Sequence, residues 1–182
     1  QVINGFNVAE RMAWLSDHLN DLNGSGIIYT LTKRDADRVT EWLKSRGHQV
    51  ETYHADLGSD NEETNRIRED REEKLLSNRV KALVSTVALG MGFDKPDLGF
   101  VVHYQSPGNL VAYYQQIGRA GRAIESACAV LFLGQEDDSI NKFFIERAAP
   151  DAEDINAVLT ALETAESALT VPKIMKEVDL TQ

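Results

Sequence analysis

The stretch VKALVSTVALGMGFDKPDLGFVVHY, residues 80–104, holds two apolar runs separated by a loop rich in glycine and polar residues. The runs VKALVST and GFVVHY consist mainly of β-branched and apolar side chains, which is typical of strands buried on both faces. Further strands are predicted at GIIYT, QVETY and ACAVLFL. Because helical segments separate these strands, the chain predicts an α/β fold with a parallel sheet covered by helices on both faces.

The segments between the strands carry helix signals. Met12, Leu15 and Leu19 recur at helical spacing, and Thr32 followed by Asp35 resembles a capping box that opens a second helix. Further helices are expected over residues 59–77, 109–117 and about 140–147.

The character of the chain changes near residue 148. The stretch AAPDAED reads as a linker, and apolar residues then recur at helical spacing from Ile155 to Leu162. We expect a first domain over residues 1–148. Residues 149–182 are expected to be a linker followed by the first helices of an accessory domain, truncated at Gln182.

Composition limits the function classes. With 182 residues, 42% hydrophobic and 26% charged, the chain reads as an ordinary soluble globular protein. No apolar run reaches the length of a membrane span, so no membrane partner is expected. Cys128 is the single cysteine, which excludes a disulfide framework and a cysteine-rich zinc site. We therefore expect no metal ligands in this chain.

The formal net charge of −10 argues against a nucleic-acid partner when taken as a mean. The excess is local, however, because residues 56–73 hold eight acids and three bases, and residues 150–182 hold seven acids and two bases. The remaining residues balance. The charge is therefore compatible with a phosphate-binding region elsewhere, since contacts to a strand act site by site.

Four polar stretches follow the predicted strands: YTLTKRD, YHADL, STVALGMGFDKPD and HYQSPGN. In a sheet of this type, ligands bind beyond the carboxyl ends of the strands. Hydroxyls and exposed amides suit phosphate oxygens, and glycine lets a backbone approach them closely. We expect a phosphate site at this end of the sheet.

The stretch YYQQIGRAGRA adds two arginines, Arg119 and Arg122, each directly after a glycine. These motifs together are similar in type, order and spacing to those of the second RecA-like domain of superfamily 2 helicases. They most resemble the RecQ family of DNA helicases, and the likeness extends over residues 26–133. Gln115 and Gln116 stand where DEAD-box RNA helicases usually carry histidine and arginine, which favours RecQ.

The resemblance implies a nucleotide site shared with a second lobe. Arg122 and Arg119 would reach the γ-phosphate of ATP, with Arg122 preferred as the arginine finger, because a planar guanidinium stabilises charge on the γ-oxygens. Asp94 would contact the ribose or couple it to the arginines. The implied nucleotide-facing set is Arg119, Arg122, Asp94, Gln115, Gly92 and Gly118.

The rest of an ATP site does not occur in the sequence. There is no G-x-x-x-x-G-K-[ST] loop to cradle phosphates and no acidic box for Mg²⁺. ATP and Mg²⁺ are therefore expected to be held mainly by an N-terminal RecA-like lobe of the same protein. This chain alone is expected neither to bind ATP tightly nor to hydrolyse it.

The resemblance also implies a groove for single-stranded or branched DNA. Its residues would contact phosphate and sugar without reading sequence, and the family implies 3′ to 5′ translocation. Such an enzyme would work inside the cell, at the nucleoid in the cytoplasm of a bacterium or in the nucleus of a eukaryote. The implied groove residues are Thr32, Lys33, Ser85, Thr86 and His54.

Other interpretations remain open at this stage. The chain could belong to another superfamily 2 motor acting on RNA or remodelling complexes, or to a binding module without motor activity. Arg119 and Arg122 could be surface arginines, Thr32 only a helix cap, and His54 a core histidine.

Three departures from the RecQ pattern bear on these roles. Ala123 and Ile124 replace the usual Asp–Gly after the arginines, and Asp56 replaces a glycine where its charge would repel phosphate. The zinc-binding cysteines common in the family are missing after Cys128. The tail instead resembles the opening helices of a winged-helix domain.

Overall fold

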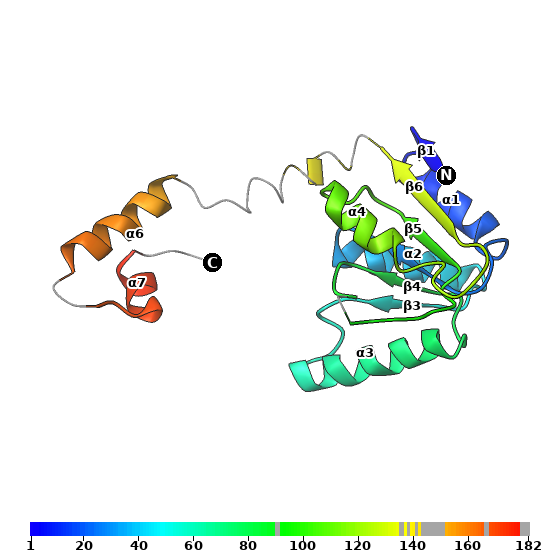
Figure 1. Cartoon of the computed structure of the whole chain (residues 1–182), viewed down its shortest axis with the longest axis horizontal. Helices are drawn as coiled ribbons and strands as arrows, with labels where there is room; N and C mark the ends of the chain where they lie inside the picture. The colour runs from blue at the N-terminus through cyan, green and yellow to red at the C-terminus, as the bar shows by residue number, and fades with distance from the viewer. Residues whose placement is uncertain are drawn as a thin grey trace. The chain divides into compact units, whose positions relative to one another are not determined.

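The computed structural model describes residues 1–89, 92–134, 137, 139–140, 142, 152–165 and 168–178. Its larger unit contains a six-stranded sheet in the order β1-β6-β5-β2-β4-β3, with every neighbouring pair parallel (Figure 1). The predicted parallel sheet is therefore confirmed. Its strands are β1 (Val2–Asn4), β2 (Gly26–Tyr29), β3 (Val50–Tyr53), β4 (Ala82–Ser85), β5 (Phe100–His103) and β6 (Cys128–Leu133).

The sheet buries both of its faces. Alternate strand residues point to opposite sides, so Ile28 packs with α1 (Val8–His18) and α2 (Lys33–Ser45), whereas Ile27 packs with α3 (Asn61–Leu76) and α4 (Leu110–Ile117). Both isoleucines are fully buried. This double burial explains why the strand sequences are continuously apolar rather than alternating.

Side-chain caps fix where these helices begin. In each of α1 to α4, the side chain of the residue before the helix accepts a hydrogen bond from a backbone N–H of the first turn. The capping residues are Asn7, Thr32, Asp60 and Asn109. The predicted Thr32 cap is therefore present in the structure.

The edge strand β1 was missed by the sequence analysis. With three residues, it is too short to show a long apolar run or a clear alternation of apolar and polar residues, and its Val2 is 59% exposed. Its place is set by pairing with β6, from Val2 opposite Leu131 to Asn4 opposite Leu133. A strand defined by its neighbour in this way leaves little trace in its own sequence.

The chain divides into two compact units, Gln1–Asn141 and Lys142–Gln182. The second contains α6 (Ala152–Thr164) and α7 (Val171–Glu177), which contact each other. The helix predicted near residues 140–147 and the linker around Pro150 lie largely outside the described residues. The domain boundary at residue 148 and the winged-helix assignment stay predictions.

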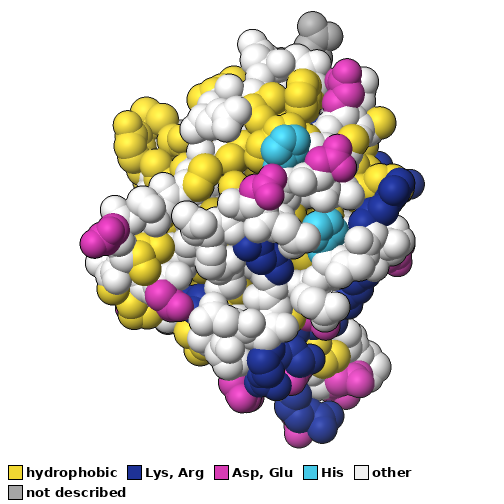
Figure 2. All heavy atoms as spheres, turned by 90° about the vertical axis from the view of Figure 1, so that its right-hand side faces the viewer, with side chains coloured by type: hydrophobic (Ala, Val, Ile, Leu, Met, Phe, Trp, Pro, Cys, Tyr) yellow, Lys and Arg dark blue, Asp and Glu magenta, His cyan; other side chains and the backbone are white. Residues whose placement is uncertain are grey.

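Side-chain chemistry adds three observations about the described part of the chain. Basic and acidic side chains are intermixed on the face of the larger unit seen in Figure 2, without one large basic field. No described helix is both long and apolar enough to cross a membrane. Among the same residues, no group of three or more His, Cys, Asp or Glu is arranged to hold a metal ion.

Candidate functional site

The central strands end level with one another. Tyr29, the last residue of β2, pairs with Ser85 of β4 and with His103 of β5. The polar segments that follow these strands therefore meet at one edge of the sheet, which we call the carboxyl edge. This is where the sequence places its phosphate-binding motifs.

One open pocket gathers the predicted nucleotide-facing residues, but it lies on the sheet face covered by α4 rather than at the carboxyl edge. The segment that carries the arginines docks on Pro96 and Leu98, just before β5 begins, so the expectation that these residues lie at the carboxyl edge is wrong. Its volume is about 420 Å³, and it lies between the loop after β4 and the end of α4. Asp94 and Arg122 both contribute to it and are both exposed. The lining residues are Gly92, Phe93, Asp94, Tyr114, Gln115, Gly118, Arg119 and Arg122, which include all six of the predicted set.

The two guanidinium groups are held by the loop after β4. Nη1 of Arg122 lies 2.9 Å from Oδ1 of Asp94, and its Nε donates to the carbonyl oxygen of Gly118 at 3.1 Å. Nη1 of Arg119 donates to the carbonyl oxygen of Phe93 at 2.9 Å. Arg119 is partly buried, whereas half of the Arg122 side chain is exposed. Arg122 is therefore both oriented and accessible to an anion.

The glycines before the arginines have separate structural roles. Gly121 has a φ of 78°, a conformation that side chains disfavour, and its N–H donates to the carbonyl oxygen of Leu98 at 3.0 Å. Gly118 ends α4, and a Cβ atom there would lie 3.1 Å from the carbonyl oxygen of Tyr114. The Ala123 N–H also donates to the loop after β4, at the carbonyl oxygen of Pro96. These contacts dock the arginine segment against that loop.

Lys33, the cation predicted to contact a DNA strand, already forms an ion pair within the protein. Lys33 is the first residue of α2, and its Nζ is hydrogen-bonded to Oδ2 of Asp56. Both side chains are more than half exposed. The hydrogen bond and charge of Lys33 lower the pKa of Asp56. Asp56, which replaces a glycine of the RecQ pattern, is therefore the ionic partner of Lys33, a residue predicted to contact DNA.

The other residues predicted to contact a DNA strand are mostly buried. The Ser85 hydroxyl is fully buried and donates to the carbonyl oxygen of Thr86 at 2.6 Å. The Thr86 hydroxyl accepts from the Ala88 N–H at 3.3 Å. His54 is 4% exposed, and its Nε2 lies 3.2 Å from Oδ1 of Asp37. These side chains lie at the carboxyl edge, but only Thr32 and Lys33 of the predicted groove set are more than slightly exposed.

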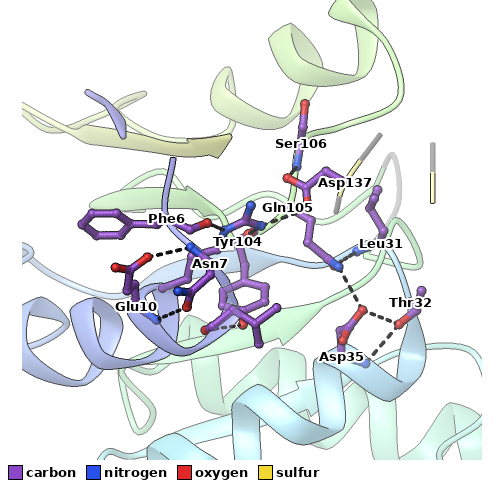
Figure 3. A network of polar contacts seen from close by, with 12 residues as sticks. Phe6, Asn7, Glu10, Leu31, Thr32, Asp35, Tyr104, Gln105, Ser106 and Asp137 are labelled. Carbon is purple, nitrogen blue, oxygen red and sulfur yellow. Dashed lines mark hydrogen bonds and ion pairs between the residues drawn. The ribbon is translucent and has the colours of Figure 1, made fainter. Parts of the chain in front are cut away.

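Gln105 is a residue that the sequence analysis did not single out. It is 5% exposed, and its Oε1 accepts a hydrogen bond from the Leu31 N–H at 2.8 Å. Its Nε2 donates to Oδ2 of Asp35 at 2.9 Å, and the same oxygen accepts from the Thr32 hydroxyl at 2.7 Å (Figure 3). Gln105 therefore fixes the loop after β2. Only its position after a predicted strand hinted at this.

A buried ion pair fixes the segment on the other side of Gln105. Nη1 of Arg11 lies 2.9 Å from Oδ1 of Asp137 and also donates to the carbonyl oxygen of Tyr104 at 2.8 Å. Oδ2 of Asp137 accepts from the Ser106 N–H at 3.2 Å (Figure 3). Since both charged side chains are buried, removing either would take this ionic contact away from the other in the protein interior, which is costly.

This fold and pocket define the class of a RecA-like helicase lobe: a parallel sheet covered by helices, with paired arginines beside an aspartate at the end of α4. Residues 10–124 match the helicase conserved C-terminal domain, and the chain belongs to that family. The resemblance to RecQ helicases is confirmed by relatives that carry this name.

Over 130 residues, the chain is 38% identical to the ATP-dependent DNA helicase RecQ of Bacillus subtilis, covering 71% of this chain and 21% of that protein. It is 36% identical over 125 residues to a putative ATP-dependent RNA helicase of Acanthamoeba polyphaga mimivirus, covering 69% and 22%. The chain thus spans about a fifth of the length of these relatives.

A structural likeness agrees with this family. S. cerevisiae Dbp5 bound to RNA and ADP BeF3 matches with a TM-score of 0.64 and 28% identity, covering 79% of this chain and 39% of that one. The RecA-like fold expected from the motifs is therefore confirmed.

Proposed function

We propose that this chain is the C-terminal motor lobe of an ATP-dependent, RecQ-like DNA helicase that moves 3′ to 5′ along single-stranded DNA. Its partner would be the N-terminal RecA-like lobe of the same protein, which would hold ATP and Mg²⁺. The observation that carries the proposal is the single pocket that contains Arg119, Arg122 and Asp94.

The pocket residues fit the triphosphate end of a nucleotide. Hydrolysis of bound ATP supplies the free energy for movement, and charge develops on the γ-phosphate oxygens during that reaction. Arg122 would contact the phosphate through the exposed part of its guanidinium, and Arg119 would add a second positive charge from its position on the Phe93 carbonyl. Asp94 would keep Arg122 oriented both with and without nucleotide.

The nucleic-acid contacts would lie along the carboxyl edge of the sheet. Lys33 would bind a backbone phosphate at the start of α2, where the helix dipole also favours an anion, and Thr32 would hold this helix start in place through its hydrogen bonds to Asp35. Thr86, Ser85 and His54 would shape the loops beneath the strand. Contacts of this kind position a strand without reading its sequence.

The isolated chain would be inactive as an ATPase. Its sequence contains no phosphate-binding loop of the G-x-x-x-x-G-K-[ST] pattern to cradle the triphosphate. An arginine finger stabilises a reaction but cannot bind the substrate without such a loop. Adding the N-terminal lobe should therefore be required for turnover.

The decisive test uses the full-length protein. ATP hydrolysis is measured with and without single-stranded DNA, and strand separation is measured on duplexes with either a 3′ or a 5′ tail. We expect stimulation by DNA and unwinding from the 3′ tail. DNA-independent hydrolysis, or unwinding only from the 5′ tail, would contradict the proposal.

A second candidate is an RNA-directed or remodelling motor of superfamily 2. The observations that favour it are the relative named as a putative RNA helicase and the likeness to Dbp5 bound to RNA. The same hydrolysis assay separates the two candidates when single-stranded RNA of matched length replaces DNA. Stronger stimulation by RNA would support this second candidate.

A further inference from the structure

The ion pair between Lys33 and Asp56 joins two loops across the carboxyl edge of the sheet. Lys33 follows β2, and Asp56 follows β3. In the sheet, β4 lies between these two strands, so the pair spans the end of β4 at Ser85. This is the region assigned above to the nucleic-acid strand.

Both partners are attached to well-anchored backbone. The Asp56 N–H donates to Nδ1 of His54 at 3.2 Å, and the buried His54 ring contacts Asp37 through its other nitrogen. Lys33 begins α2 directly after the Thr32 cap. The carboxylate and the ammonium group are thus brought together by the fold rather than by chance contact of two long side chains.

The side chains themselves remain accessible. Lys33 is 51% exposed and Asp56 is 66% exposed. Exposed ion pairs are weak, because water screens the charges and ordering the side chains costs entropy. A phosphate group approaching this edge could therefore displace the carboxylate from the ammonium group.

We propose that Asp56 sets the affinity of this chain for single-stranded DNA by competing with the backbone phosphate for Lys33. The inference rests on the proposed strand groove. In the unbound protein the carboxylate neutralises Lys33, and in the bound protein it is left near a phosphate of like charge. Both effects weaken binding.

The same competition changes the dependence on salt. A lysine that binds a phosphate releases a condensed cation, and each such contact steepens the salt dependence of single-strand binding by about 0.7 in a plot of log K against log salt. An Asp56 carboxylate freed from Lys33 attracts a cation and offsets that release. Removing its charge should therefore restore the missing slope.

The test measures binding of the full-length protein to labelled single-stranded DNA without nucleotide, over a series of salt concentrations. The variants are Asp56→Asn, Lys33→Ala and the double variant. Asp17→Asn is the charge-matched control, because Asp17 is exposed near the end of α1, away from the carboxyl edge where that helix begins. Thermal unfolding of each variant checks that the fold is retained.

We expect Asp56→Asn to tighten binding about two- to fivefold at low salt and to steepen the slope by up to about 0.7. Lys33→Ala should weaken binding and remove most of the gain from Asp56→Asn in the double variant. Asp17→Asn should change the affinity much less.

The outcomes separate this inference from the proposed function. If Lys33→Ala leaves the affinity unchanged, both the strand groove at Lys33 and the role of Asp56 are wrong. If Lys33→Ala weakens binding but Asp56→Asn acts no more strongly than Asp17→Asn, only the role of Asp56 is overturned. An equal increase in DNA affinity from Asp56→Asn, whether residue 33 is lysine or alanine, would also overturn the role of Asp56.

Discussion

Arg122 and Asp94 are 28 positions apart in the sequence, yet Nη1 of the arginine lies 2.9 Å from Oδ1 of the carboxylate. The pair joins the segment after α4 to the loop after β4. Half of the arginine side chain and 60% of the aspartate side chain remain exposed. The contact therefore orients a guanidinium group without burying it, as a residue that acts on a ligand from another lobe would require.

Asp94→Asn should reduce ATP turnover more than it reduces stability. The amide cannot pair with the charge of Arg122, so the guanidinium loses its orientation, and we expect kcat of the full-length protein to fall about 10- to 100-fold. An exposed pair contributes about 0–1 kcal/mol, so the free energy of unfolding should change little. Steady-state ATPase assays and urea unfolding measure the two quantities. Unchanged kcat would show that the pair is incidental.

Gly121→Ala should disturb the arginine segment through its backbone. The φ of 78° costs a residue with a side chain about 1–2 kcal/mol, and the new Cβ would lie 3.1 Å from that of Ala127. Gly47→Ala is the matched control, with a φ of 86°, open space around the Cβ and a position beyond the end of α2.

Both glycine variants should lower the melting temperature, measured by circular dichroism, because both force alanine into a left-handed conformation. Only Gly121→Ala should lower ATP turnover in the full-length protein. Equal turnover in the two variants would argue against a functional role for the docking of this segment.

Gln105→Ala should destabilise the loop after β2. It removes the hydrogen-bond partner of the Leu31 N–H and one of the partners of the Asp35 carboxylate, which costs about 1–3 kcal/mol in the free energy of unfolding. Weaker binding of single-stranded DNA should follow, because the loop carries Thr32 and Lys33. Gln49→Ala, on an exposed side chain, should change neither quantity. Loss of stability with unaltered DNA affinity would limit Gln105 to a structural role.

His103 should make the stability depend on pH. It is fully buried, burial lowers its pKa, and its Nε2 lies 2.8 Å from Oε1 of Gln116. As pH falls through the ordinary histidine pKa of about 6.5, the unfolded chain takes up a proton before the folded chain does, so stability is lost.

Unfolding by urea at about pH 7 and about pH 5 measures this loss. His103→Gln should reduce the difference between the two conditions, whereas His18→Gln, at an exposed histidine, should retain it. The same pH dependence in both variants would assign the effect to other groups.

The features predicted best from the sequence are those with strong local signals. The continuous apolar runs around Ile27 and Val101 required a sheet buried on both faces, and Thr32 marked a helix start by its side-chain chemistry alone. The residues of the pocket beside Arg122 were named from the resemblance of their motifs to those of RecQ helicases, and the structure brings them together. Their expected place at the carboxyl edge was wrong, because the segment after α4 returns toward the start of β6 and docks just before β5.

The features that could not be predicted depend on tertiary contacts. β1 exists because Val2 pairs with β6, and its own three residues do not specify a strand. The role of Gln105 depends on Leu31 and Asp35 lying within hydrogen-bonding distance. Asp56 looked only like a repulsive charge, because no sequence pattern shows that Lys33 lies beside it.

The central claim is that Arg122 acts on ATP held by another lobe, and the direct measurement is ATP turnover by the full-length Arg122→Ala variant with saturating single-stranded DNA. Arg79→Ala is the matched control, since Arg79 also forms a 2.9 Å ion pair, with Glu73, and is 51% exposed. We expect kcat to fall by about 10³-fold or more in Arg122→Ala, with ATP and DNA binding largely retained, and to stay near the unsubstituted value in Arg79→Ala. Normal turnover by Arg122→Ala would contradict the account.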